Sequence, residues 1–571
     1  MRSLLVLCGL SLPGVGLASI PLGEKIDDGV LVDVTDDGLD AVVPAIRGAI
    51  PSSIDVPTVN MSGGGSCAAR YSIYSDNLEA FVSLQSVDIS PGTDALQVVA
   101  TAEVWVNSQS APAQLDYSGA LICIPFSGTC DVWVEPIQVE ITGVIELSLV
   151  EDPEGADFDG DGTPDTKMLD ADVLPLEWSW DATGDNIELD DCPTINTLID
   201  VLDFFTLDIR QIVLDQVEGE IDNLVQSLPT DFEPLIEDAF SGLVISEQID
   251  LLGAQVSLDL WPESMVIQPT GMRVSLGSVV GAETDPCIDR YGFQGSRETA
   301  GQPPDLQHST APVVAPHVVA LADDDFANHF LFGVWSTGLL CLDLGAEDSP
   351  VDLPVPLDST LLSLLAGDAF DRFFPESQPL DVVTDPRQPP EVDLTGPNDV
   401  NVMIDPLGLD IGAEVDGRKA RLVSVDVVGN IGVDVAFDPA TGELAPNILV
   451  EEGSITPSVV YNEFAPEASA SIEGGLTTLI DTLAISALGG ITNGVAVAIP
   501  ALEGFGLTDM VVEPTGSTGD HLGAFSSLGQ VSYPSAGCSQ GCGGCSSGGG
   551  IPASAIVLLF PALVALRRRR R

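Results

Sequence analysis

Two kinds of hydrophobic spacing alternate along the chain and mark out its expected elements. From Leu96 to Val106, and again from Ile137 to Leu149, every second residue is apolar and most residues between are polar. A period of two is typical of a strand with one apolar face and one wet face. Strands this long favour a curved antiparallel sheet, and further ones are expected at 409–415 and 431–437.

Spacings of three and four residues predict helices between these strands. The longest helical run begins at Ile209, and we expect Pro229 to end it before a shorter run that reaches Leu243. In the second half, acidic residues 323–325 precede an apolar helical segment and can cap its N-terminus. A helix of small residues is expected over about 476–488.

A seven-residue sequence occurs twice, as MVIQPTG over 265–271 and as MVVEPTG over 510–516. Each copy follows an alternating segment and precedes a Leu-Gly pair, at 276–277 and at 522–523. Pro and Gly in these copies are interpreted as turn formers after an apolar strand. The matching flanks predict an α+β fold of two tandem, duplicated units, each a highly curved antiparallel β-sheet wrapped around a long amphipathic helix.

The chain is long enough, at 571 residues, to hold two or more cores. A Pro-rich stretch with little periodicity is expected to link the two units. The predicted division is a signal peptide at 1–19, an N-terminal extension at 20–66, a first barrel-like domain with an inserted acidic loop at 67–283, a linker at 284–316, a second barrel-like domain at 317–530, a Cys/Gly-rich spacer at 531–550, and an apolar segment with an Arg tail at 551–571.

Both ends carry features of an exported protein. Residues 1–19 combine Arg2, an apolar run and a small-residue exit, which is typical of a secretory signal peptide. At the other end a Ser/Gly spacer, an apolar segment and five arginines follow three cysteines, Cys538, Cys542 and Cys545. This tail resembles the MYXO-CTERM sorting signals of surface proteins in myxobacteria and their relatives, which implies a sorting protease and display at the cell surface. An ordinary C-terminal membrane anchor is the alternative, and in either case we expect the body to be exported and held at the cell surface or outer membrane.

The chain is strongly acidic, with a formal charge of −68. Removal of Arg2 and the five tail arginines would leave 13 basic against 87 acidic side chains, a formal charge of −74. Such a surface repels nucleic acid and anionic membranes, so we expect no nucleic-acid partner.

Six cysteines remain in the predicted body, and an even number in an exported protein indicates disulfides. Cys123 and Cys130 are close enough in sequence to close a small loop. The other pairings stay open, although Cys287 with Cys341 would tie the two halves together. The six candidates are Cys67, Cys123, Cys130, Cys192, Cys287 and Cys341.

One acidic loop has the spacing of a calcium site. Its carboxylates occupy loop positions 1, 3, 5 and 9 with Gly162 at position 6, so that alternate side chains can converge on one Ca²⁺ while glycine permits a sharp turn. Position 12 is Met168 instead of Glu, and Asp170 could substitute. The predicted role of the Ca²⁺ is structural, the alternative is an acidic turn, and the proposed ligands are Asp157, Asp159, Asp161 and Asp165.

Enzyme signatures are weak, and we expect no catalysis. The four histidines have no evident Ser or Cys partner in the sequence, and they are His308, His317, His329 and His521. The GxSxG match at 537–541 lies in the low-complexity tail, without the strand and helix that a nucleophile elbow requires.

The order of elements resembles the two-domain form of the tubular lipid-binding superfamily, the family of bactericidal/permeability-increasing protein, lipopolysaccharide-binding protein and the plasma lipid-transfer proteins. The segments that carry the resemblance are 326–340, similar to the helix that opens the second barrel, and 499–514, similar to its closing strands. The resemblance covers about 67–530 and implies acyl chains bound between sheet and helix. In the best-known members of this family, a basic tip is associated with lipopolysaccharide binding. The predicted body of this chain has only 13 basic residues, which favours a neutral or hydrophobic ligand.

This resemblance gives the leading functional hypothesis, a non-catalytic protein that binds or shuttles a lipid or other hydrophobic ligand in apolar grooves. Candidate lining residues are Val139, Ile141, Val213, Val217 and Ile221. The same residues could instead fill a closed core, and the protein would then be a calcium-braced structural or adhesive surface protein. An inhibitor or receptor for a partner protein is a third possibility.

Overall fold

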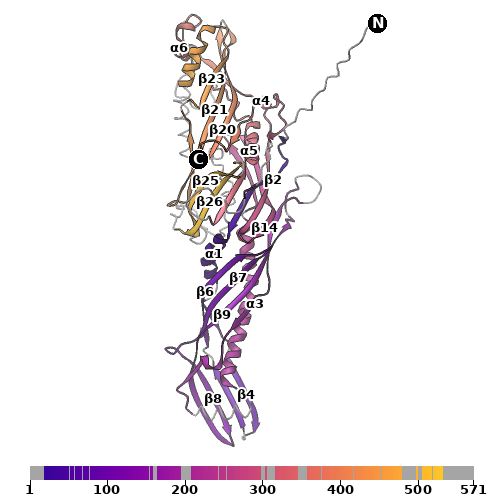
Figure 1. Cartoon of the computed structure of the whole chain (residues 1–571), viewed down its shortest axis with the longest axis vertical. Coiled ribbons are helices and arrows are strands. Elements are labelled where there is room, and N and C mark those ends of the chain that lie inside the picture. Colours follow the sequence, from indigo (N-terminus) through magenta and orange to yellow (C-terminus); the bar gives the residue numbers. More distant parts are fainter. Residues whose placement is uncertain are drawn as a thin grey trace, which may run out of the picture.

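A computed structural model gives the fold of most of the chain. It describes residues 19–49, 52–56, 58–66, 69–75, 78–153, 155–157, 164–193, 208–241, 243–251, 254–297, 303–304, 316–344, 357–374, 376–415, 417–451, 453–478, 497–498, 505–516 and 519–531. The described part is an elongated α+β structure of curled, antiparallel sheets with few helices (Figure 1).

A seven-stranded antiparallel sheet occupies the middle of the molecule (Figure 1) and contains strands from both ends of the sequence. Hairpin β14–β15 flanks β2 on one side, hairpin β25–β26 flanks β17 on the other, and β2 pairs with β17 at the centre. In spatial order the strands are β13 (Ile245–Leu251), β14 (Ala254–Gln268), β15 (Gly271–Ala282), β2 (Lys25–Thr35), β17 (Val318–Asp323), β26 (His521–Gln530) and β25 (Phe505–Thr515).

A ten-stranded sheet extends from this centre toward one end of the molecule. Its longest strand, β9, pairs with β7 and β8, and also with β10, β11 and β12. The strands are β3 (Ser53–Asp55), β4 (Val59–Ser66), β5 (Ala69–Ser75), β6 (Glu79–Pro91), β7 (Leu96–Val106), β8 (Ala113–Leu121), β9 (Ile124–Glu151), β10 (Lys167–Val173), β11 (Glu177–Trp180) and β12 (Ile187–Asp190).

A second seven-stranded sheet forms the opposite end (Figure 1) and is built mainly on the pairing of β20 with β21. Its strands are β18 (Leu380–Pro386), β19 (Glu391–Asp393), β20 (Val400–Val415), β21 (Arg418–Asp438), β22 (Glu443–Leu449), β23 (Ile455–Tyr461) and β24 (Val497–Ala498). Strands β1 (Ser19–Ile20) and β16 (Ser296–Arg297) form a separate two-stranded sheet.

The helices pack against these sheets. All residues from Asp325 to Ser336 of α5 are buried, because the helix contacts apolar clusters on two sides. The helices are α1 (Asp36–Ala49), α3 (Ile209–Ser241), α4 (Pro286–Asp289), α5 (Asp324–Ser336) and α6 (Ser359–Ala366), and the short 3₁₀ turns are η1 (Gly184–Asn186), η2 (Gly367–Ala369) and η3 (Pro466–Ala468). No helix among the described residues is both long and apolar enough to cross a membrane.

The predicted strand at 96–106 coincides with β7, and β9, β20 and β21 contain the other predicted strands. The prediction that Pro229 ends the long helix is wrong, since α3 continues through Pro229 and Pro234 to Ser241. Proline removes one helical N–H, but Val225 before it and Ile236 after it pack against apolar clusters, so tertiary packing holds both sides of the helix together. The small-residue helix predicted over 476–488 is described only to residue 478.

Each copy of the repeated heptapeptide lies in a hairpin of the central sheet. MVIQPTG ends β14 at Gln268, turns at Pro269 and Thr270, and starts β15 at Gly271. MVVEPTG keeps Pro514 and Thr515 inside β25, so its turn begins later, at Gly516. Gly271 has a φ of 146°, and an added Cβ would lie 2.4 Å from the Val34 carbonyl oxygen, so the close approach to β2 requires glycine.

The predicted N-terminal extension and the predicted linker both contain regular secondary structure. Residues 20–66 are predicted to be an N-terminal extension, yet β2 lies at the centre of the middle sheet between β15 and β17. Within the predicted linker, residues 286–289 form α4 and residues 296–297 form β16. Local periodicity does not report such pairings, because they join segments that are far apart in sequence.

Candidate functional site

An apolar layer lies between helix α3 and the large curled sheet. Residues of α3 spaced one helical turn apart are buried against the inward residues of β7 and β9, which alternate along each strand. Four of the five predicted lining residues are buried in this layer, namely Val139, Val213, Val217 and Ile221. Ile141 is partly buried and packs against the same cluster. The structure therefore brings the five residues together, and four of them are in a filled core.

The rim of this layer is aromatic and partly open to solvent. Trp178 and Trp180 of β11 are half-buried and pack edge to face, with ring centroids 5.7 Å apart. Both rings contact the apolar cluster, as does Leu176. The apolar layer thus reaches the surface along β11.

Three carboxylates of α3 fasten the helix to the sheet beside this rim. Asp222 accepts a hydrogen bond from the Trp178 indole at 3.3 Å, and Glu233 accepts one from the backbone N–H of Val173 at 3.2 Å. Glu237 accepts from the N–H of Ala171 at 3.5 Å. The acidic side chains of α3 thereby satisfy donors along β10 and β11.

The predicted calcium loop connects two paired strands. Lys167 at the start of β10 faces Glu151 at the end of β9, and the Asp165 N–H donates to the Ala156 carbonyl at 2.8 Å. Asp157 and Asp165 lie near this closed base, while Asp159 and Asp161 lie outside the described residues. Asp170, the substitute considered for position 12, lies in β10 opposite Ser148.

The disulfides differ from the expected small loop. Cys130 is bonded to Cys192, with Cα atoms 4.5 Å apart, so a bond between Cys123 and Cys130 is excluded. Cys130 is buried in β9. Its partner Cys192 follows β12, and β12 pairs with β9. Cys123 is itself disulfide-bonded, and Cys67 and the tail cysteines Cys538, Cys542 and Cys545 lie outside the described residues.

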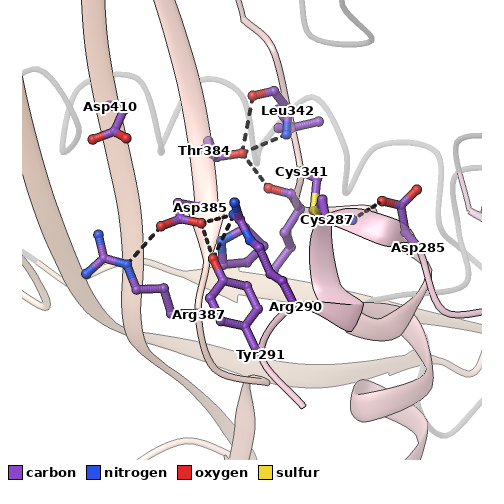
Figure 2. A network of polar contacts seen from close by, with 12 residues as sticks. Asp285, Cys287, Arg290, Tyr291, Cys341, Leu342, Thr384, Asp385, Arg387 and Asp410 are labelled. Atoms are coloured by element: carbon purple, nitrogen blue, oxygen red, sulfur yellow. Dashed lines mark hydrogen bonds and ion pairs between the residues drawn. A yellow bond between two sulfur atoms is a disulfide. The ribbon is translucent and has the colours of Figure 1, made fainter. Parts of the chain in front are cut away.

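The second disulfide joins Cys287 of α4 to Cys341, with Cα atoms 6.7 Å apart, as the sequence suggested. Beside it, Asp385 of β18 accepts hydrogen bonds from Arg290, Tyr291 and Arg387 (Figure 2). Arg387 also pairs with Asp426 at 2.8 Å. The network joins α4 and the residues that follow it to β18 of the second seven-stranded sheet.

Charge in this network is balanced locally. Partial burial raises the pKa of Asp385, but hydrogen bonds from Tyr291 and Arg387 and the charge of Arg290 outweigh that effect and hold the pKa below its ordinary value. The hydrogen bond to Asp385, together with the charge of Asp426, raises the pKa of Arg387 although partial burial acts in the opposite direction. Asp385 is therefore a stable anion, and the arrangement suits a structural clasp.

A second polar cluster surrounds buried His521 at the start of β26. Its Nε2 lies 3.3 Å from a carboxylate oxygen of Asp323, and its Nδ1 lies 3.1 Å from one of Asp520. Burial, together with the charges of Asp325, Asp324 and Asp520, raises the pKa of Asp323 to about 7, although the Asp325 N–H acts in the opposite direction. The cluster was missed in the sequence because Asp323 is distant from the adjacent pair Asp520 and His521 and joins them only through the pairing of β17 with β26.

Two further histidines have partners that the sequence did not reveal. The Nδ1 of His329 lies 2.9 Å from the Ser296 hydroxyl, and both residues are buried. Burial lowers the pKa of His329 to about 4, so its ring is neutral at pH 7. The Nδ1 of His317 accepts the N–H of Leu528 at 2.9 Å. His308 lies outside the described residues.

No protein-family model matches the chain, and no curated protein is significantly similar to it in sequence. Among solved structures, lipopolysaccharide binding protein is similar over 89% of this chain and 100% of its own, with 11% identity and a TM-score of 0.47. P47 of Clostridium botulinum E1 is similar over 88% and 99%, with 7% identity and a TM-score of 0.23. Takeout 1 of Epiphyas postvittana covers 34% of this chain and 93% of its own, with 10% identity and a TM-score of 0.17. At these identities and scores the likenesses do not assign a function.

Proposed function

We propose that this chain binds or shuttles a lipid or another hydrophobic molecule, without catalysis, between α3 and the curled sheet of its first half. The observation that carries the proposal is the continuous apolar layer between helix and sheet, whose rim at Ile141, Leu176, Trp178 and Trp180 is only partly buried. An apolar chain that entered along this rim would meet aliphatic side chains from both the helix and the strands.

The energetics of such binding are favourable. Each methylene removed from water contributes about 0.8 kcal/mol, so several methylenes of one acyl chain offset the loss of the three hydrogen bonds that α3 makes to β10 and β11. Because the chain carries a charge of −68, the ligand is expected to be neutral or apolar at its exposed end.

The same proposal covers the location of the protein. The signal-like residues 1–19 and the tail at 531–571 are the basis for export and for display at the cell surface, through either a sorting protease or a membrane anchor. The acidic loop is proposed to bind one structural Ca²⁺ through Asp157, Asp159, Asp161 and Asp165, since alternate carboxylates around Gly162 fit a hard cation with oxygen ligands.

We further propose that the two halves are duplicated units. Support comes from the order of the central sheet. Strand β2 leads into the acidic N-terminus of α1 and lies beside hairpin β14–β15, and β17 leads into the acidic N-terminus of α5 and lies beside hairpin β25–β26. The repeated heptapeptide falls at the corresponding place in both hairpins.

Uptake of a fluorescent fatty acid, together with native mass spectrometry of the purified chain, tests the ligand proposal. We expect co-purifying lipid and saturable uptake. Ile141→Asn at the rim should reduce uptake severalfold, whereas Val150→Asn, at an exposed position of the same strand, should not. A chain that is empty and takes up no fatty acid contradicts the proposal.

The second candidate is a calcium-braced structural or adhesive surface protein with closed cores. It is favoured by the burial of Val139, Val213, Val217 and Ile221, which fill the layer with their own side chains. Absence of uptake combined with an increase in melting temperature on adding Ca²⁺ would support this second function.

A further inference from the structure

The hairpin between β8 and β9 forms the far end of the molecule, next to the end of β5 (Figure 1). At its two-residue turn Ile122 is 78% exposed and the following strand residue Ile124 is 69% exposed. Directly behind them, Leu121 and Phe126 are partly buried and pack against the apolar cluster that contains α3. We call residues 117–130 with strands β4 and β5 the distal tip.

The distal tip differs in charge from the rest of the protein. Close to one residue in seven of the chain is acidic, 87 of 571, yet 117–130 and 59–75 contain no Asp or Glu. Their only charged side chain is Arg70, which is exposed and lies on β5 opposite Ala120. The acidic body is repelled from an anionic interface, whereas the tip can approach one.

The turn itself keeps apolar side chains where turns normally have small polar residues. Ile122 and Cys123 have φ values of 51° and 64°, the conformation for which Asn-Gly is the preferred sequence. A β-branched residue at positive φ is a conformational outlier. The disulfide at Cys123 constrains this turn, and the Ile122 side chain beside it remains largely exposed.

We propose that the distal tip docks on a lipid bilayer by inserting Ile122 and Ile124 into its interfacial region. Exposed apolar side chains at the end of an uncharged hairpin gain free energy by leaving water, and the single cation Arg70 complements lipid phosphates. Since the tip has almost no charge, docking is driven by apolar burial, and it differs little between neutral and mildly anionic bilayers. The inference goes beyond the proposed ligand binding, because docking requires no lipid between α3 and the sheet.

A variant that relieves the turn separates docking from folding. Ile122→Asn suits positive φ and Ile124→Thr keeps strand propensity, so the double variant should fold at least as well as the parent chain. In the full chain, its partitioning onto phosphatidylcholine vesicles should fall by about tenfold or more. The matched control is Leu364→Gln, which removes a 74% exposed aliphatic side chain from α6 at the opposite end.

Tryptophan quenching locates the contact independently of the tail. With vesicles of acyl-chain-brominated phosphatidylcholine, a tryptophan introduced by Ile124→Trp should be quenched, and one introduced by Leu364→Trp should not. Equal partitioning of the double variant and the parent chain, or equal quenching at both positions, would overturn the proposal. Loss of a dimer on Ile122→Asn/Ile124→Thr without any vesicle binding would overturn it in favour of a second copy of the chain. Failure of fatty-acid uptake with intact vesicle docking would reject the proposed ligand binding alone.

Discussion

Leu31 of β2 and Leu321 of β17 lie opposite each other at the centre of the middle sheet, and each is 1% exposed. They pack with Val319 and Phe525 in one small cluster. Because β2 carries β15 on its other edge and β17 carries β26, this pair joins the first and second halves of the chain.

Truncation of this pair should weaken the whole molecule. Leu321→Ala is expected to lower the free energy of unfolding by about 2–5 kcal/mol, because it removes buried methyl groups and leaves a cavity between both halves. Chemical denaturation followed by circular dichroism measures the change. Val460→Ala, at a 54% exposed position of β23, is the control and should change little. An equally small effect of Leu321→Ala would show that the two halves do not depend on this contact.

The network around Asp385 should behave as a coupled unit. Tyr291→Phe and Asp385→Asn each remove part of the contact between the segment after α4 and β18, and we expect each to cost about 1–3 kcal/mol. In a double-mutant cycle the two losses should be non-additive by about 0.5 kcal/mol or more. Additive losses would mean that the hydroxyl and the carboxylate stabilise the fold separately.

The Cys287–Cys341 bond should stabilise the same junction. Replacement of both cysteines by serine is expected to lower the free energy of unfolding by about 2–4 kcal/mol, since the cross-link restricts the unfolded chain. Thermal unfolding of this variant, compared with the parent chain in a reductant, measures the effect. A melting temperature unchanged by the replacement is the contrary result.

Stability should depend on pH through two buried groups with opposite signs. The folded-state pKa of Asp323, about 7, is above its ordinary value of 3.8, so its ionisation makes stability fall as pH rises from about 4 to 7. The folded-state pKa of His329, about 4, is below its ordinary value of 6.5, so its protonation makes stability fall as pH drops from about 6.5 to 4.

Asp323→Asn keeps an acceptor for the Asp325 N–H and removes the first effect. Relative to the parent chain, this variant should gain stability as pH rises from 4 to 7, by on the order of 1 kcal/mol or more. His329→Gln should gain stability relative to the parent as pH drops from 6.5 to 4. Denaturation curves at several pH values measure both differences, and a difference that does not change with pH refutes the corresponding assignment.

Much of the local structure was predictable because its causes are local. Strand β7 and the buried positions of β9 follow from alternation of apolar and polar residues, and the register of α3 follows from the spacing of Val213, Val217 and Ile221. The end of α3 was not predictable, because packing on both sides of Pro229 outweighs the break that proline favours.

The sequence by itself determined the alternation that forms the long strands, the acidity of the chain and the repetition of one heptapeptide. Only the tertiary structure decided that β2 lies between the two halves, that Cys130 bonds to Cys192, and that His521 lies between Asp323 and Asp520. The physical reason is that a strand or helix is specified by neighbours along the chain, whereas these contacts join segments that meet only after the sheets have curled and paired.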